Sequence, residues 1–496
     1  MNRNPADLAA KEYDVIVVGA GIHGAAAAWS AARAGLRVAL VDQADFGGGA
    51  SANSLKIIHG GFRYLQHGNI RRMRESIRCR RRFMAWAPSL VRPCPFVVPT
   101  FGLGLRSSPI MRCALLINDV VASDRNAGLH PNARLDSGRT LTRKEMASIF
   151  PSALPDNTTG GALWYDAIAD DTERLTLSFI LDAVAHGASA ANYAAVERIL
   201  ASNGKVAGVA LRDGLTGKTH EVRGLAVVNA SGTSIDALAG SHEQRRWIKA
   251  WNLIVDRQWF GGYGVGLEGK AAHVDPDAIV QRGKRNFFFA PWRTGTMIGT
   301  VYRHAPDATR EPGLSDAEIV ETLADINAVY PAAELRRSDV IMTHVGYLPG
   351  HPDPAMSHEV DKHSAVLDAS RHGGPAGLFS IKGVKYTTGL EVGMLAATRA
   401  AEHAGRPCPA PPEVTCPLAL LQPADASHAV KQEGAVHLAD LIFRRDGSGS
   451  FRHPGKAALE EKAQAMGQIL GWDARKRMEE IADVVRTYRL LGCSMS

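Results

Sequence analysis

The sequence predicts an α/β fold in which a parallel sheet is combined with an antiparallel sheet and a C-terminal helical region. Between residues 13 and 42, a strand pattern, a glycine-rich turn, an alanine-rich helix pattern and a second strand pattern follow one another. After residue 240 the chain is rich in short apolar and aromatic runs, which are typical of antiparallel strands. Beyond a proline-rich segment at 405–425, apolar residues recur at helical spacing.

The first unit is a complete strand–helix–strand pattern. Residues 14–18 form an apolar run of the kind found in buried parallel strands. We expect a helix over 22–34, which Gly35 ends, and a second strand over 36–41. The turn between the first strand and the helix is therefore a candidate ligand site, because parallel sheets bind nucleotides there.

That turn carries the motif G-x-G-x-x-G. Gly19 permits the tight turn, Gly21 lets the backbone approach a pyrophosphate, and Gly24 allows the helix to pack closely on the strand. Asp42, at the end of the second strand, is placed to accept hydrogen bonds from an adenosine ribose. The whole unit predicts a Rossmann-like domain that holds an adenine dinucleotide.

A second G-x-G-x-x-G string, at 264–269, is not expected to bind a nucleotide. No buried strand pattern runs directly into it, so we interpret it as a glycine-bearing strand or loop. A single dinucleotide site disfavours an enzyme that reduces a flavin with a nicotinamide cofactor.

The remaining elements follow from periodicity and turn signals. We expect helices at 71–86, 172–186, 316–328, 388–404, 459–470 and 478–488. We expect strands on both sides of the turn at Asn203-Gly204 and at 225–230, 287–289, 296–299, 340–342 and 378–381.

Composition excludes several classes of protein. The 496 residues are 45% hydrophobic and 22% charged, which argues against a mainly disordered, collagen-like or coiled-coil chain. A net charge of +7 is mild for this length and does not indicate nucleic-acid binding. The six cysteines form no C-x-x-C pair, which favours a reducing compartment. We find no signal-peptide pattern and no apolar run of about 18 residues, so we expect no membrane span.

Two further segments carry side chains suited to a ligand site. The segment H-G-G-x-R-Y at 59–64 joins flexible backbone to a base, a cation and a phenol, although arginine and tyrosine often serve structure alone. Lys385 lies between a strand end and a helix, where it can stabilise a reduced cofactor ring or hold an anionic substrate. No metal-binding spacing and no G-x-S-x-G string is present, so we expect neither a metal site nor a serine triad.

The predicted helix at 71–86 is strongly basic. It contains one acidic residue, Glu75, and seven arginines: Arg71, Arg72, Arg74, Arg78, Arg80, Arg81 and Arg82. Two interpretations remain open, a solvated charged face and a peripheral contact with an anionic membrane surface.

The segment at 51–65, S-A-N-S-L-K-I-I-H-G-G-F-R-Y-L, resembles the FAD-dependent glycerol-3-phosphate dehydrogenases. These enzymes belong to the wider D-amino-acid-oxidase-like flavoprotein group. The resemblance covers nearly the whole chain and includes Tyr165-Asp166, 170–175, 228–232, Pro291-Trp292, 298–300, Lys385-x-Thr387-Thr388, 443–445 and 453–455.

This resemblance implies an activity and a set of site residues. Such enzymes oxidise a secondary alcohol by hydride transfer to the flavin N5, and then reduce quinone or, in an oxidase branch, oxygen; the quinone-linked members are membrane-associated. By matching positions, FAD would be held by Gly19, Gly21, Gly24, Asp42, Ser54, Lys56, His59, Gly232, Lys385 and Thr387. The catalytic residues would be Arg63, Tyr64 and Lys385.

The chain departs from the family pattern where a substrate phosphate would bind. The family's G-x-R-P segment reads G-Y-L-P at 346–349, and a second phosphate-binding arginine is missing near 361–363. We match the family's K-G-x-H strand to 255–258, and the glycine pair before Lys385 is altered to Gly383-Val384. Each lost charge-assisted hydrogen bond costs about 1.5–3 kcal/mol, so a different hydroxylated substrate is expected unless other cations compensate. The substrate-binding candidates are Arg257, Gln258 and Lys362.

Three functions remain open from the sequence. The first is an FAD-dependent alcohol dehydrogenase or oxidase on a polyol, or on glycerol 3-phosphate if Arg257 or Lys362 supplies the missing charge. The second is an amine or amino-acid oxidase, with Arg257 as the partner of a carboxylate. The third is a flavin-binding protein without turnover that acts at a membrane or partner.

The matched segments divide the chain into three expected domains. An FAD-binding domain is expected to comprise 12–65, 150–240 and 365–405, and a substrate domain 66–149 and 241–364. Residues 415–496 are expected to form a C-terminal helical domain. We expect a cytoplasmic location, with peripheral contact at the inner face of the membrane as the alternative.

Overall fold

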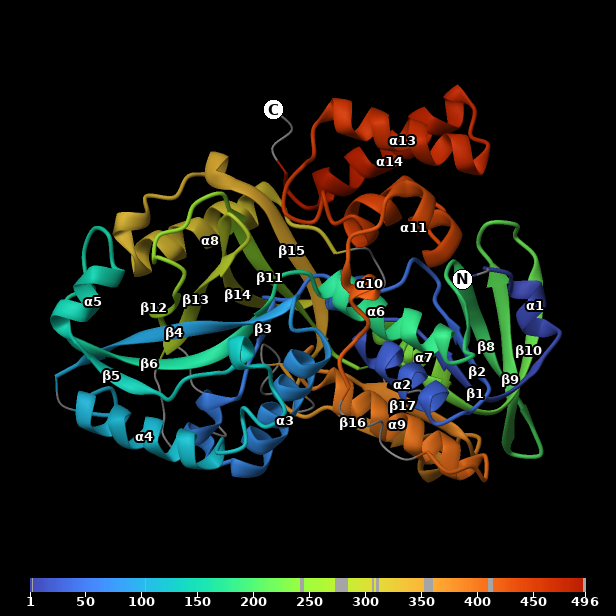
Figure 1. Ribbon diagram of the computed structural model, residues 1–496, viewed down its shortest axis with the longest axis horizontal. Coiled ribbons are helices and arrows are strands. Elements are labelled where there is room, and N and C mark those ends of the chain that lie inside the picture. Colours follow the sequence, from blue (N-terminus) through green and yellow to red (C-terminus); the bar gives the residue numbers. More distant parts are fainter. Residues whose placement is uncertain are drawn as a thin grey trace.

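Figure 1 shows the computed structural model, in which two sheets lie side by side and helices of the C-terminal region cover their upper edge. The structure describes residues 1, 3–102, 104–240, 245–272, 284–305, 307–308, 312–351, 360–408 and 414–493. The predicted proline-rich segment at 405–425 includes residues 409–413, which lie outside this part of the chain.

The first sheet is built on parallel strands. Its order is β16–β17–β10–β1–β2–β7, and the hairpin of β8 and β9 extends it from β10. Val15 on β1 lies beside Ala226 on β10 and Val38 on β2, and both pairings are parallel. The bounds are Glu12–Val18 for β1, Val38–Val41 for β2, Ser189–Ala191 for β7, Ala194–Ser202 for β8, Lys205–Asp213 for β9, Thr219–Asn229 for β10, Ala365–Asp368 for β16 and Leu378–Lys382 for β17.

Three helices share a hydrophobic core with this sheet: α2 (Ile22–Arg33), α6 (Thr172–Ala185) and α9 (Gly389–His403). Small residues let α2 and α9 approach closely, because a Cβ at Gly393 would lie 2.4 Å from the carbonyl oxygen of His23. The first predicted helix is α2, which ends at Arg33, one residue earlier than expected. The alanines of α2 are buried.

The second sheet is mainly antiparallel and has the order β15–β11–β14–β13–β12–β4–β6–β3, with β5 paired to β6. The rejected glycine string forms β12, as interpreted from the sequence. The bounds are Ile57–Ile58 for β3, Val91–Phe101 for β4, Arg139–Thr142 for β5, Thr158–Ala169 for β6, Trp247–Val255 for β11, Gly264–Ala272 for β12, Lys284–Trp292 for β13, Gly295–Ala305 for β14 and Val340–Pro349 for β15.

Two segments of the expected FAD-binding ranges join this second sheet instead. β6 pairs with β4 along its whole length, from Phe101 beside Thr158 to Val91 beside Ala169. β3 pairs with the end of β6 through Ile57 and Ile58. Because these pairings join residues far apart in sequence, the local pattern of 150–169 did not reveal them.

The remaining helices flank the second sheet, pack as short helices on the first sheet or form the C-terminal region. The flanking helices are α3 (Ile70–Trp86), α4 (Ser108–Val121), α5 (Arg143–Ile149) and α8 (Asp316–Val329), and two short helices are α1 (Pro5–Ala9) and α7 (Ile235–Ala239). The C-terminal helices are α10 (Leu418–Leu421), α11 (Ala426–Glu433), α12 (Leu438–Asp440), α13 (Lys456–Leu470) and α14 (Ala474–Leu490), with a helical turn at Leu441–Arg445. The fold class expected from the sequence is therefore confirmed. Within the described residues, no helix has both the length and the apolar composition needed to cross a membrane.

Candidate active site

A cavity of about 900 Å³ lies between the carboxyl ends of the parallel strands and the antiparallel sheet. One wall contains Gly21 from the turn after β1, Asp42 after β2 and Gly232 after β10. The opposite wall contains Asn252 from β11 and Tyr347 from β15. Ligands of α/β proteins bind at such strand ends, so this cavity is the candidate active site.

The three glycines of the motif have different roles in this wall. Gly19 has a φ of +96°, and a Cβ there would lie 2.4 Å from the carbonyl oxygen of Ala230. A Cβ at Gly24 would lie 1.8 Å from the carbonyl oxygen of Gly19, so these two glycines are required for packing. Gly21 has an ordinary φ of −67° and lines the cavity, where a Cβ would meet only the Ser51 hydroxyl, at 2.9 Å.

Asp42 closes the same end of the cavity. Its carboxylate accepts hydrogen bonds from the backbone N–H groups of Ala20, at 2.6 Å, and Ala44, at 2.9 Å. Burial raises the pKa of Asp42 to about 6, although these two N–H groups lower it. A carboxylate with remaining acceptor capacity at this position suits the hydroxyl groups of a ribose.

The other end of the cavity contains a cluster around Tyr64. Lys385 Nζ is hydrogen-bonded to the Tyr64 hydroxyl and lies 4.4 Å from the centre of the ring. The guanidinium of Arg72 lies 4.5 Å from the same ring, and the His59 ring packs edge-on at 5.9 Å. Arg63, which immediately precedes Tyr64 in the chain, is exposed and also lines the cavity.

The positive charges in this cluster alter the basicity of their neighbours. Burial lowers the pKa of Lys385 well below its usual range, and Arg72 and Arg63 lower it further. Burial also lowers the pKa of His59, with added effects of Lys385 and Arg72. Both shifts favour the uncharged form of the side chain, which is the form that can accept a proton.

These features fit an adenine dinucleotide with a redox ring. Gly21 lines the cavity at the N-terminus of α2, where a side chain would project, and the Ile22 N–H at that end donates to the Ser51 hydroxyl at 3.0 Å. The buried Nε2 of His23, which also lines the cavity, has no partner within the described residues. The sequence profile of the FAD-dependent oxidoreductases, the DAO family, matches residues 14–402.

The chain belongs to the FAD-dependent oxidoreductase family. FAD is therefore its cofactor, and the chain is an FAD-dependent enzyme. A glycerol-3-phosphate dehydrogenase of Synechocystis is 29% identical over 84% of this chain and 75% of that protein. A probable mitochondrial glycerol-3-phosphate dehydrogenase of Caenorhabditis elegans is 32% identical over 76% of this chain, which spans about half (51%) of that relative. The structure of a glycerol-3-phosphate dehydrogenase from Bacillus halodurans complexed with FAD has a TM-score of 0.70 and 21% identity, and the match covers 99% of this chain and 97% of that one.

Most of the cofactor residues expected from the family line the cavity, but Lys56 and Gly24 do not. The residues that line it are Gly19, Gly21, Asp42, Ser54, His59, Gly232, Lys385 and Thr387. Lys56 is fully buried, and its amine contacts Glu173 Oε2 at 2.7 Å, Thr172 Oγ1 at 2.5 Å and the Ala52 carbonyl oxygen at 2.8 Å. Lys56 therefore anchors the preceding loop to α6.

The expected substrate residues are separated by the fold. Lys362 lines the cavity, and its carbonyl oxygen accepts a hydrogen bond from Arg72. Arg257 donates to the Ala333 carbonyl oxygen at 3.0 Å, and Gln258 donates to that of Arg293 at 2.8 Å. Neither Arg257 nor Gln258 is among the described residues that line the cavity, so both predictions are corrected.

The wall of the cavity opposite the glycine motif is lined in part by β11, which ends at Val255, before Arg257 and Gln258. Ala250 and Asn252 line the cavity, and the Asn252 side-chain oxygen accepts a hydrogen bond from the Thr300 hydroxyl at 2.8 Å. Asn252, Thr300 and Tyr347 were not expected as site residues; the strand pattern at 247–255 was the signal for the first of them.

A buried ion pair supports the turn that precedes Tyr64. Asp166 on β6 pairs with Arg80 on α3, and the same carboxylate accepts hydrogen bonds from the Gly60 N–H and from Trp164 Nε1. Gly61 then adopts a φ of +79°. Arg80, expected on a basic surface, is therefore a structural residue that fixes the approach of 59–64 to the cavity.

Proposed function

We propose that this enzyme oxidises the secondary alcohol group of a polyol or of a glycerol-3-phosphate-like substrate. The observation that supports this most is the position of Lys385 and Tyr64 in the cavity that Gly21 also lines. When bound, FAD supplies a two-electron acceptor that takes a hydride at its N5 position. The names of the relatives, which are glycerol-3-phosphate dehydrogenases, support the CH–OH substrate.

In this proposal Lys385 accepts the proton of the substrate hydroxyl. Its lowered pKa favours the neutral amine, which is the form that can act as a base. The Tyr64 hydroxyl holds the Lys385 amine in place, and the guanidinium of Arg72 packs on the Tyr64 ring. Arg63, Arg72 and Lys362 are among the cationic residues that line the cavity, whereas residues 346–349 present Tyr347, Leu348 and Pro349 to it and no arginine.

The two alternatives lose support from particular residues. Amino-acid oxidation relied on Arg257 to bind a carboxylate, and that guanidinium instead contacts Ala333 and packs on the ring of Trp259 at 5.3 Å. A flavoprotein without turnover would not need a base with a lowered pKa in contact with Tyr64.

Anaerobic titration of the holoenzyme tests the substrate class. We expect one compound from a panel of polyols and glycerol or sugar phosphates to bleach the flavin absorbance band, because hydride transfer reduces the flavin. Amino acids serve as the control and should not bleach it. Bleaching by amino acids alone would contradict the proposal, and a flavin that no panel member reduces would favour the protein without turnover. Reoxidation by a soluble quinone or by air then identifies the acceptor.

We further propose a peripheral membrane contact, at α4 instead of the basic helix. In α3, Arg74 and Arg81 pair with Asp124, Arg78 pairs with Glu391 and Arg80 is buried. Much of the positive charge expected to face a membrane is therefore neutralised within the protein.

Helix α4 has apolar side chains on both its buried face and its exposed face. Met111 and Leu115 are buried, while Leu116 and Val120 are 59% and 75% exposed. The exposed apolar residues of this region are Ile70, Leu105, Ile110, Leu116, Ile117 and Val120. Exposed Arg112 on the same helix and Arg71 at the start of α3 add positive charge, which suits an anionic lipid surface.

Co-sedimentation with anionic vesicles tests this contact. We expect the enzyme to bind vesicles of phosphatidylglycerol and phosphatidylcholine at low salt and a Leu116→Ser/Val120→Ser variant to lose most of that binding, because each apolar side chain buried contributes about 1.5–3 kcal/mol. Val320→Ser, at a 54% exposed position on α8, is the matched control and should bind normally. Equal binding of all three proteins, or no binding to vesicles at low salt, would contradict the proposal.

A further inference from the structure

The loop that follows Asp42 is enclosed between the cavity and the C-terminal helices. We define residues 43–53 as the cofactor loop, because Gln43, Ala44, Asp45, Gly48, Gly49, Ala50, Ser51 and Asn53 all line the cavity. The Gly47 N–H donates to the carbonyl oxygen of Ala20, which ties the loop to the glycine motif. On another side the loop contacts β15, since the Val345 N–H donates to the Asn53 side-chain oxygen at 3.3 Å.

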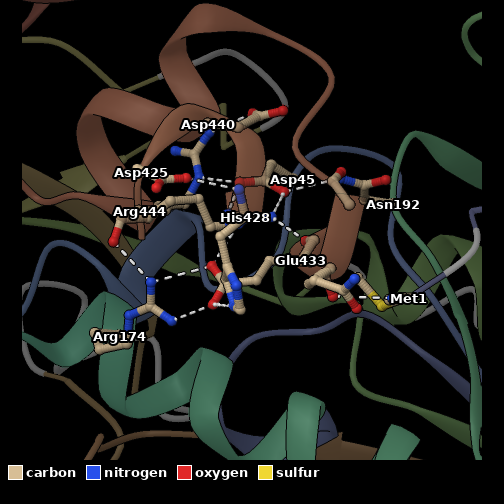
Figure 2. A network of polar contacts seen from close by, with 12 residues as sticks. Met1, Asp45, Arg174, Asn192, Asp425, His428, Glu433, Asp440 and Arg444 are labelled. Atoms are coloured by element: carbon tan, nitrogen blue, oxygen red, sulfur yellow. Dashed lines mark hydrogen bonds and ion pairs between the residues drawn. The ribbon is translucent and has the colours of Figure 1, made fainter. Parts of the chain in front are cut away.

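Asp45 connects this loop to the C-terminal region. Figure 2 shows its carboxylate among side chains from distant parts of the sequence. Arg445 donates to both carboxylate oxygens, at 2.7 and 2.8 Å, and Arg444 and Asn192 each donate another hydrogen bond. The side chains of Asp45 and Arg445 are 1% and 0% exposed, so the pair is removed from water and screened little by salt.

A second buried ion pair joins the same two parts of the protein without touching the loop. Arg174 on α6 donates to both carboxylate oxygens of Glu433, at 2.7 and 3.0 Å, and to the carbonyl oxygen of Arg445. Its side chain is 2% exposed, which closely matches the burial of Arg445. Arg445 Nε lies 3.8 Å from Glu433 Oε2, so the two arginine pairs adjoin, and of these two arginines Arg445 is the one that contacts the cofactor loop. Figure 2 shows Arg174 beside Glu433.

The charges at Asp45 also act on Asp42. The negative charge of Asp45 raises the pKa of Asp42, and the positive charge of Arg444 lowers it. The backbone N–H groups of Ala20 and Ala44 lower it as well, against the larger effect of burial. Around Asp45 itself the charged groups are Arg444 and Arg445, and Arg444 is shared with Asp440.

We propose that the C-terminal helical region positions the cofactor loop for FAD, and that Arg444 and Arg445 are positioning residues that act through Asp45. The bidentate contact of Arg445 fixes the loop in the conformation that lines the cavity, so the loop does not have to be ordered when FAD binds. Arg444 donates a hydrogen bond to the Asp45 carboxylate, and at that position its positive charge opposes the effect that the negative charge of Asp45 has on Asp42. This role concerns the retention of FAD and goes beyond the proposed oxidation, since it holds for any substrate.

Titration of the apoprotein with FAD tests the first part of this proposal. We expect Arg445→Met to weaken FAD binding about tenfold or more, because the loop must then be ordered at the expense of binding energy. Arg174→Met is the matched control: it should lower the melting temperature to a similar extent but change the FAD dissociation constant less than about twofold. Equal weakening by the two variants would show that Arg445 acts only through stability and would overturn the proposal.

The pH dependence of FAD binding tests the second part and remains informative if Arg445→Met does not fold. In the parent protein the affinity should fall as the pH decreases through about 6, because protonated Asp42 loses acceptor capacity toward the ribose. In Arg444→Gln the pKa of Asp42 rises, so the loss of affinity should begin at a higher pH. Arg174→Met should keep the parent profile. An unchanged profile in Arg444→Gln would overturn the role of Arg444.

Discussion

Gly21→Val should abolish FAD retention while the protein remains folded. A valine side chain would project into the cavity at the N-terminus of α2 and keep a pyrophosphate away from the N–H groups of the first turn. Loss of two charge-assisted hydrogen bonds, at about 1.5–3 kcal/mol each, weakens binding about a hundredfold or more. The measurement is the FAD dissociation constant of the apoprotein, together with its circular dichroism spectrum.

Two other glycine variants act as controls for this prediction. Gly21→Ala should have a smaller effect, because among the described residues its Cβ meets the Ser51 side chain, whose hydroxyl at 2.9 Å can move away at the cost of the hydrogen bond that it accepts from the Ile22 N–H. Gly24→Ala should instead disrupt folding, because its Cβ would lie 1.8 Å from a backbone oxygen in the packed turn. Full FAD occupancy in Gly21→Val would mean that the pyrophosphate binds elsewhere.

Lys385→Met should slow substrate-driven flavin reduction about a hundredfold or more, with little loss of bound FAD. The expected size follows from the contribution of a positioned general base, which is about 100-fold to 10,000-fold. In the parent enzyme the rate constant of reduction should rise with pH and reach a plateau, because the base must be unprotonated. That plateau should begin below the ordinary pKa range of lysine, since burial and two arginines lower the pKa of Lys385. Stopped-flow reduction under anaerobic conditions measures both effects.

Lys385→Arg separates the role of a base from that of a positive charge. Arginine keeps the positive charge but does not lose its proton in this pH range. If Lys385 is the proton acceptor, flavin reduction should therefore be as slow in Lys385→Arg as in Lys385→Met. Rapid reduction in Lys385→Arg would assign the residue to charge stabilisation. Tyr64→Phe should give an intermediate rate, because it removes only the hydroxyl that holds the amine.

The cofactor half of the site could be predicted because its determinants are local. The strand, the glycine turn, the helix and Asp42 lie within about 30 residues. Their order and spacing are those of a dinucleotide-binding strand–helix–strand unit. Ser54 and His59 were placed by resemblance and line the cavity with them. Lys56 could not be placed in this way, because its partner Glu173 is more than a hundred residues away and the contact exists only after folding.

The substrate half depends on strand register, which the sequence does not fix by itself. Asn252 on β11 lines the cavity, whereas Arg257 lies beyond the end of that strand, and the sequence pattern alone does not distinguish the two positions. Similarly, β6 could not be assigned to the antiparallel sheet from 150–169 alone, because its partner β4 precedes it by more than fifty residues.

The two walls of the cavity belong to different sheets, and this has an evolutionary consequence. Substitutions on β11 and β15 change the side chains that line one wall of the cavity but leave the glycine turn and Asp42 of the other sheet unchanged. A lineage can therefore exchange one substrate for another through a few point mutations without rebuilding its redox chemistry. The sequence G-Y-L-P at 346–349 is the kind of change this architecture tolerates, and the same strands are the natural targets for a library that selects new alcohol substrates.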